Sequence, residues 1–195
     1  MEQPVIFLDF DGVLNTEQYQ ARLAVESKPT KDAWGPLFDP RAVTNLQKIV
    51  EATDARIVIS SSWRYIHKLG SLRMMWEVRG LPCGIHDVVP HGATNISRGE
   101  DINWYLKKHG RPNYVIIDDD SDMCDDQLCN FVQTDTCDGI TERDAKLCVD
   151  ILNGIKILNP IRMNYELRFR WMLMCKCPGI ENNIEELLEN YDSKF

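Results

Sequence analysis

Three short runs of apolar residues stand out along the chain, and each is followed at once by polar side chains. The runs occupy residues 5–8, 57–59 and 114–117. Short runs that are apolar throughout, without alternation, are typical of strands buried on both faces of a parallel sheet. We therefore expect three strands of one parallel sheet, with polar residues at their carboxyl ends.

Between these runs, apolar residues recur at helical spacing. Asp39 and Pro40 provide an N-cap and a first helical position, and the apolar residues over 43–50 continue with a helical period. Similar patterns predict helices over residues 63–78, with Ile66 on the buried side, after Ser97, and from Thr141 to 152. Weaker patterns predict short strands over 85–89 and 130–134. Strands that alternate with helices are typical of an α/β fold with a doubly wound parallel sheet and right-handed crossovers.

Two parts of the chain depart from this alternation. Residues 15–38 show no sustained period and contain Pro29, Gly35 and Pro36, so we expect a loop-rich insert there. The last forty residues combine aromatic, methionine and arginine side chains with an acidic tail, which we interpret as two helices. The sequence thus predicts an α/β domain over residues 1–153 and a helical C-terminal extension over 154–195, packed on that domain.

Composition and charge narrow the possible classes of function. The net charge of −8 argues against extensive binding along a nucleic-acid backbone. No apolar stretch is long enough to span a bilayer, and the N-terminus lacks the basic region and cleavage site of a secretory signal. The seven cysteines are odd in number and follow no zinc-site spacing. We therefore expect a cytoplasmic protein with reduced thiols and no membrane partner.

The polar residues at the three strand ends are candidates for a single site. They are Asp9 and Asp11, Ser60 and Ser61, and Asp118 and Asp119. Ligands of doubly wound sheets bind outside the carboxyl ends of the strands, so the three groups should meet in space. Crowded carboxylates repel one another without a cation, and hard oxygen ligands suit Mg²⁺. An Asp-Gly turn explains Asp11 alone but not the second pair, so we expect a magnesium site of Asp9, Asp11, Asp118 and Asp119.

These segments resemble the signatures of the haloacid dehalogenase (HAD) superfamily. Residues 9–15, Asp-Phe-Asp-Gly-Val-Leu-Asn, are similar to its first signature, residues 57–60 to its second, and residues 115–119 to its fourth. Arg98 stands where the third signature has a basic residue. Ser61-Ser62-Trp63-Arg64 and Gly139-Ile140-Thr141 further resemble a small branch associated with RNA-repair proteins. The resemblance extends from residue 5 to about residue 152, and it implies a HAD-like Rossmannoid fold.

The resemblance implies a role for each candidate residue. Asp9 would attack phosphorus and form an aspartyl-phosphate, and Asp11 would act as general acid and then as general base. Ser60 would hydrogen-bond a phosphoryl oxygen, and Arg98 would neutralise the charge on the phosphoryl group. Asp119, with Asp118 as the alternative, would bind the metal directly.

Several assignments have alternatives. Ser61 could replace Ser60, and Lys107 or Lys108 could replace Arg98, because most members of the superfamily use lysine there. Arg64 is either a second phosphate ligand or a charge that faces solvent. Trp63 and Trp104 stand at helical positions, where we expect both to pack in the core.

The spacing of the signatures bears on the substrate. Residues 15–38 are too few for a large cap domain, and only one helix fits between Arg98 and Asp118. Capless members of the superfamily often act on large substrates, so the resemblance implies a phosphomonoesterase for a nucleotide or a nucleic-acid terminal phosphate. Alternatives are a phosphatase of small metabolites or phosphoproteins, and a non-catalytic module that binds a phosphorylated partner.

Overall fold

A five-stranded parallel sheet forms the centre of the protein, in a computed structural model that describes residues 3–90 and 97–155. The strands lie in the order β3-β2-β1-β4-β5, and every neighbouring pair is parallel. Their bounds are β1 Val5–Leu8, β2 Arg56–Ile59, β3 Ile85–Val88, β4 Tyr114–Asp118 and β5 Phe131–Gln133. The doubly wound α/β fold expected from the alternation of strands and helices is confirmed.

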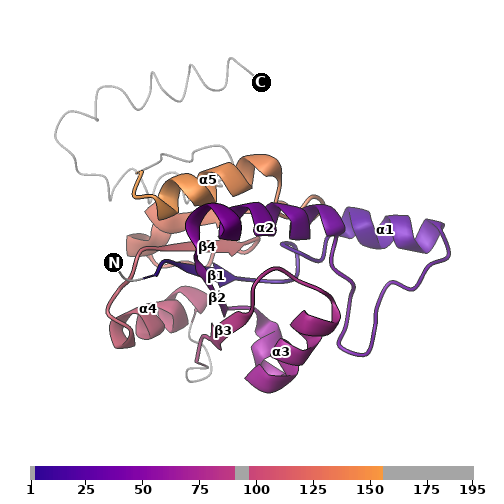
Figure 1. Ribbon diagram of the computed structural model, residues 1–195, viewed down its shortest axis with the longest axis horizontal. Helices are drawn as coiled ribbons and strands as arrows, with labels where there is room; N and C mark the ends of the chain where they lie inside the picture. Colours follow the sequence, from indigo (N-terminus) through magenta and orange to yellow (C-terminus); the bar gives the residue numbers. More distant parts are fainter. Residues whose placement is uncertain (1–2, 91–96, 156–195) are drawn as a thin grey trace, which may run out of the picture.

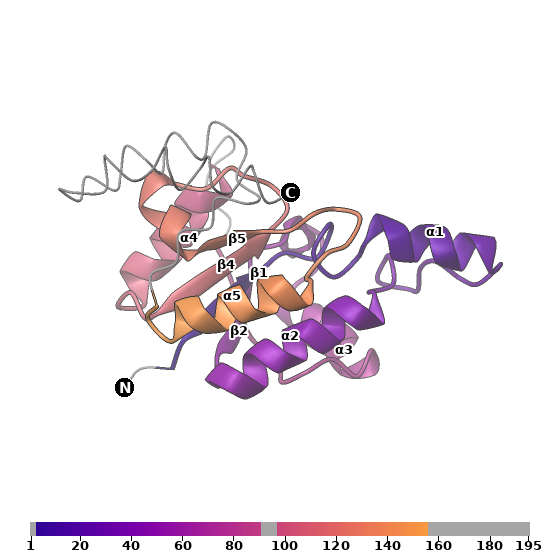
Figure 2. The ribbon, with the colours of Figure 1, turned by 90° about the horizontal axis from the view of Figure 1, so that it is seen from above.

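Helices cover both faces of this sheet (Figures 1 and 2). The helices are α1 Glu17–Val25, α2 Pro40–Thr53, α3 Leu69–Val78, α4 Arg98–Lys108 and α5 Glu142–Leu152, with short 3₁₀ helices η1 Ser62–Tyr65 and η2 Asp125–Asn130. In Figure 2, α2, α3 and α5 lie on one side of the sheet and α4 on the other. The core is accordingly divided in two, with α2, α3 and α5 contributing to one apolar cluster and α4 and η2 to the other.

The register of the central strands places the predicted site residues side by side. Leu8 pairs with Ile59 of β2 and with Ile117 of β4. The next residue of each strand or its continuation is therefore Asp9, Ser60 or Asp118, all at the same edge of the sheet. Because β1 is central and fully buried, the polar groups that follow it meet in the middle of that edge.

The insert over residues 15–38, expected to be rich in loops, also contains the helix α1, which was not predicted. Thr16 caps this helix by accepting a hydrogen bond from the backbone nitrogen of Tyr19 at 3.2 Å. Only Leu23 of the helix is buried, so no apolar period marks it in the sequence. α1 extends beyond the sheet at the right of Figure 1.

The prediction of a single helix over residues 63–78 was wrong, because the segment divides into η1 and α3. Ile66 lies between the two and is 80% exposed, although its spacing suggested a buried position. Trp63 is buried as expected, whereas Trp104 is 54% exposed on α4. Helical spacing alone therefore predicted the wrong burial for two side chains. Ile66 is exposed because it lies between η1 and α3, and Trp104 is exposed on α4.

The C-terminal extension was predicted over residues 154–195. Only its first two residues belong to the described part of the chain. Its helical content and packing stay predictions. Among the described residues, no helix combines the length and the apolar character needed to cross a bilayer.

Candidate active site at the carboxyl ends of the strands

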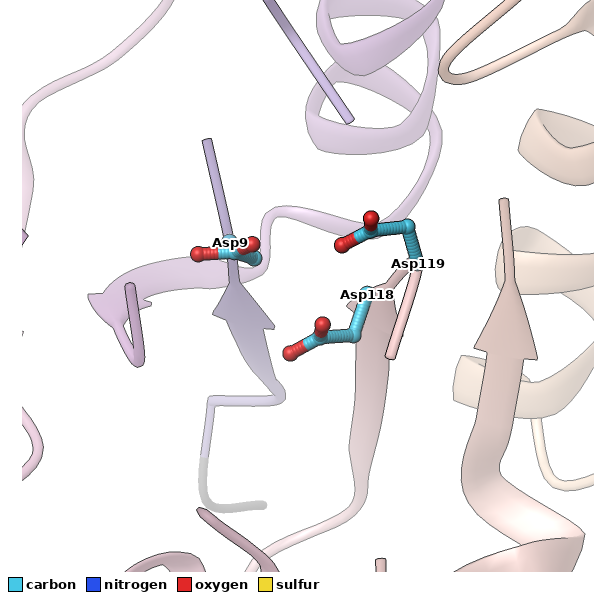
Figure 3. A group of neighbouring side chains, drawn as sticks. All are labelled: Asp9, Asp118 and Asp119. Carbon is cyan, nitrogen blue, oxygen red and sulfur yellow. The ribbon is translucent and has the colours of Figure 1, made fainter. Parts of the chain in front are cut away.

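Three carboxylates converge where β1 and β4 end. Asp9 follows β1, Asp118 is the last residue of β4, and Asp119 follows it (Figure 3). One carboxylate oxygen from each residue lies within 4.8 Å of the others. Asp9 and Asp118 are buried and Asp119 is half-buried. Asp9 thus forms one cluster with Asp118 and Asp119, which lie more than a hundred residues away in the sequence.

A glycine allows Asp119 to approach the loop after β1. Gly12 has a φ of +68°, and a Cβ there would lie 2.5 Å from Cγ of Asp119. Any other residue would therefore be strained and would also push the carboxylate away. The carbonyl oxygen of Gly12 accepts a hydrogen bond from the Thr134 hydroxyl at 2.8 Å, which holds the loop against the segment after β5.

Arg98 brings a positive charge into the cluster from the first turn of α4. Its Nη1 lies 3.0 Å from Oδ1 of Asp9 and donates to Oδ2 of Asp118 at 2.6 Å. The neighbouring Gly99 lets α4 come close to the loop after β4, because a Cβ there would collide with the backbone nitrogen of Cys124. Arg98 therefore stands where the sequence expected a basic residue.

The two lysines considered as alternatives to Arg98 lie far from the cluster along the helix. Lys107 and Lys108 occupy the last turn of α4. Ten residues of helix separate Arg98 from Lys108, which is about 15 Å at 1.5 Å per residue. The geometry thus favours Arg98 over either lysine as the partner of the carboxylates.

The cluster carries more negative than positive charge. Burial raises the pKa of Asp9, and the nearby guanidinium of Arg98 and a hydrogen bond with Ser61 only partly oppose the rise. Burial and the repulsion of Asp9 raise the pKa of Asp118 well above its usual range, and the same two causes raise that of Asp119. Burial opposes the charge of Arg98, but Asp118 and Asp9 outweigh it and raise its pKa.

The charges and the donor atoms of the cluster can be compared with what a divalent cation requires. When all three carboxylates are ionised, one guanidinium leaves an excess of two negative charges, which a divalent ion would balance. All the donor atoms are carboxylate oxygens, the ligands that hard cations such as Mg²⁺ prefer. The donor set and the charge therefore both suit a divalent metal.

Asp11 is held by a different set of contacts. Its Oδ1 accepts a hydrogen bond from Nδ2 of Asn15 at 2.8 Å, and its Oδ2 accepts one from Nε1 of Trp63 at 2.9 Å. The three-carboxylate cluster does not include Asp11, so its expected part in metal binding stays a prediction. Neither Asn15 nor Trp63 was singled out from the sequence for this role. Two features of the sequence could have pointed to these residues as part of the site. Asn15 belongs to the first signature, and Trp63 follows the serines closely.

The two candidate serines lie at the end of β2 and are both fully buried. Ser61 hydrogen-bonds Asp9, and its oxygen also accepts from the backbone nitrogen of Trp63 at 3.4 Å. The Ser60 hydroxyl has no hydrogen-bond partner among the described residues. Both serines therefore stay candidates, Ser60 because its hydroxyl has no competing partner and Ser61 because it already contacts Asp9.

Arg64 does not face solvent, which was one of its two expected roles. Its side chain is 2% exposed and forms a 2.8 Å ion pair with Asp101 of α4, which is 5% exposed. It also donates a hydrogen bond to the carbonyl oxygen of Ser60. Arg64 thus joins the end of β2 to α4, the helix that carries Arg98 one turn before Asp101.

Comparison with known proteins gives one family match. The family is described as the HAD domain in Swiss Army Knife RNA repair proteins, and its profile matches residues 5–145. This range exceeds half of the 195 residues and includes the three clustered aspartates, Arg98 and both serines. No curated protein and no solved structure matches the chain.

Proposed function

The chain belongs to the family of HAD domains in Swiss Army Knife RNA repair proteins, and on this premise we propose that it is a magnesium-dependent phosphomonoesterase. The membership confirms the resemblance expected from the sequence. One observation carries the proposal, namely that Asp9, Asp118 and Asp119 converge within 4.8 Å at the carboxyl edge of the sheet, beside Arg98. A buried, acidic cluster with one guanidinium is suited to a divalent cation and a phosphoryl group together.

Asp9 is the nucleophile in this proposal. A carboxylate oxygen of Asp9 attacks phosphorus, the bond from phosphorus to the leaving oxygen breaks, and an aspartyl-phosphate forms. Water then attacks phosphorus, and the bond to Asp9 breaks to release inorganic phosphate. Arg98, which lies 3.0 Å from Asp9, stabilises the negative charge of the phosphoryl oxygens in both steps.

Asp11 moves the proton in both steps. It donates a proton to the leaving oxygen as the first bond breaks, and it accepts a proton from the attacking water in the second step. Ser60 or Ser61 hydrogen-bonds a phosphoryl oxygen. Asp9, Asp118 and Asp119 would hold the metal. A bound Mg²⁺ would offset the excess negative charge of the cluster and polarise a phosphoryl oxygen.

The substrate that we propose is a terminal phosphate of a nucleic acid or a nucleotide. The description of the family in terms of RNA repair supports this choice. The net charge of −8 suits recognition of a chain end rather than of a long backbone. Small phosphorylated metabolites and phosphoproteins are the alternatives that a substrate screen distinguishes.

Removal of the metal is expected to abolish activity. With an aryl phosphate as substrate, hydrolysis should stop in excess EDTA and return when Mg²⁺ is added back, because the carboxylate cluster would then regain its counter-charge. The release of inorganic phosphate from 3′- and 5′-phosphorylated oligonucleotides, nucleotides and sugar phosphates should be compared in the same buffer. Full activity in EDTA would contradict the metal assignment, and preference for a sugar phosphate would contradict the substrate class.

A further inference from the structure

Each carboxylate oxygen of Asp11 accepts a hydrogen bond from a neutral donor. Asn15 donates to Oδ1 and Trp63 to Oδ2, at 2.8 and 2.9 Å. Asn15 belongs to the same loop, four residues on, whereas Trp63 comes from η1, 52 residues away. A carboxylate with a directional donor on each oxygen cannot rotate without losing a hydrogen bond. The arrangement therefore fixes the direction in which Asp11 presents its oxygens.

The indole of Trp63 is itself immobilised. Its ring packs edge-on against Phe10 with centroids 5.3 Å apart, and it contacts Phe38 at 5.9 Å. Gly35 closes over the far edge of the ring, where a Cβ would lie 2.7 Å from Cη2. Phe10 is the residue between Asp9 and Asp11. Packing thus ties the position of the indole N–H to the loop that carries both aspartates.

The partner of this N–H distinguishes Trp63 from another buried tryptophan of the same core. Trp76 also packs near Phe10, at 6.1 Å, but its Nε1 donates to the backbone carbonyls of Pro82 and Cys83 at 3.0 and 3.2 Å. A buried indole needs only some acceptor, and a backbone carbonyl satisfies it. The N–H of Trp63 instead donates to the side chain of Asp11, which transfers the proton in the proposed function.

We propose that Trp63, assisted by Asn15, is a positioning residue that holds Asp11 in line with the leaving oxygen of the substrate. The inference rests on the proposed function, since it concerns the proton transfer of that reaction. When Asp11 gives its proton to the leaving oxygen, the carboxylate that forms keeps both donors, Nδ2 of Asn15 and Nε1 of Trp63. The donors thus hold the group in one orientation while it switches from acid to base. A misplacement of about 1 Å can cost roughly 100-fold in rate.

The Trp63→Phe variant tests this role, with Trp76→Phe as its matched control. Each substitution removes one indole N–H from the same core and keeps an aromatic ring. The measurement is kcat for a series of phosphate monoesters whose leaving groups range from nitrophenols to alkyl alcohols. Trp63→Phe should lose about 10-fold to 100-fold with alkyl leaving groups, which need the proton, and only a few-fold with nitrophenols, which do not. Trp76→Phe should keep the wild-type dependence on the leaving group.

If Trp63 had a purely structural role, the loss of kcat would not depend on the leaving group. Equal losses for all leaving groups, or the same pattern in Trp76→Phe, would overturn the inference. If Trp63→Phe does not fold, Asn15→Ala removes the other donor from a half-buried position and should show the same selective loss for alkyl esters; an unchanged leaving-group dependence would then overturn it. The proposed function fails separately, if the wild-type protein hydrolyses no phosphate monoester.

Discussion

Substituting Asp9 by Asn is expected to abolish turnover and leave the fold intact. An amide is a far poorer nucleophile than a carboxylate, so kcat should fall by about 1,000-fold or more. The fold should persist because burial raises the pKa of Asp9, which means that its charge opposes folding at neutral pH. Arg98 also contacts Asp118, at 2.6 Å, so its charge should still be paired in the variant.

Steady-state hydrolysis of an aryl phosphate, together with thermal unfolding, checks this expectation. Without added metal, the melting temperature of Asp9→Asn should equal or exceed that of the wild type. Asp54→Asn is the matched control, because it makes the same chemical change at an exposed position that precedes β2, at the opposite edge of the sheet. Turnover close to the wild-type value in Asp9→Asn would rule out Asp9 as the nucleophile.

Removing Arg64 is expected to cause the largest loss of stability among single substitutions near the site. Its ion pair with Asp101 is almost fully buried, so Arg64→Ala leaves a carboxylate without its guanidinium in a desolvated position. Breaking such a pair costs about 3–5 kcal/mol. Phosphate affinity should fall as well, because Arg64 connects the carbonyl of Ser60 to the helix of Arg98.

Urea unfolding of the single and double variants checks the pair. If Arg64 and Asp101 act together, the double variant Arg64→Ala/Asp101→Ala should lose less stability than the sum of the two single variants. Lys48→Ala is the control, because Lys48 and Glu142 form a 3.1 Å ion pair whose side chains are 50% and 86% exposed. An exposed pair is worth about 1 kcal/mol or less. A loss of that size in Arg64→Ala would contradict the account of the buried pair.

The convergence of the acidic residues could be predicted from the sequence because it follows from two general properties of parallel sheets. Apolar runs mark buried strands, and the carboxyl ends of such strands share one edge. Asp9 and Asp118 were therefore expected at the same edge once residues 5–8 and 114–117 were identified as strands, and the pairing of β1 with β4 brings them together. The basic residue at Arg98 followed from its place at the start of the helix before β4.

The contacts that complete the site could not be predicted, because they depend on how loops fold back. Trp63 donates to Asp11 across 52 residues of sequence, whereas the period of apolar residues suggested only that it packs in the core as part of a continuous helix. The pairing of Arg64 with Asp101 spans 37 residues and leaves no local pattern. α1 was missed for a related reason, since a helix with one buried side chain has no apolar period.

The central claim is a covalent intermediate on Asp9, and mass spectrometry of protein quenched in acid during turnover tests it most directly. The Asp11→Asn variant with a nitrophenyl phosphate suits the experiment. The good leaving group departs without a proton, whereas the second step lacks its base, so the intermediate should accumulate. The account predicts one phosphoryl group on the peptide that contains Asp9, and none when Asp9→Asn is added. Release of nitrophenol with that peptide unmodified, or with the phosphoryl group on another residue, would contradict it.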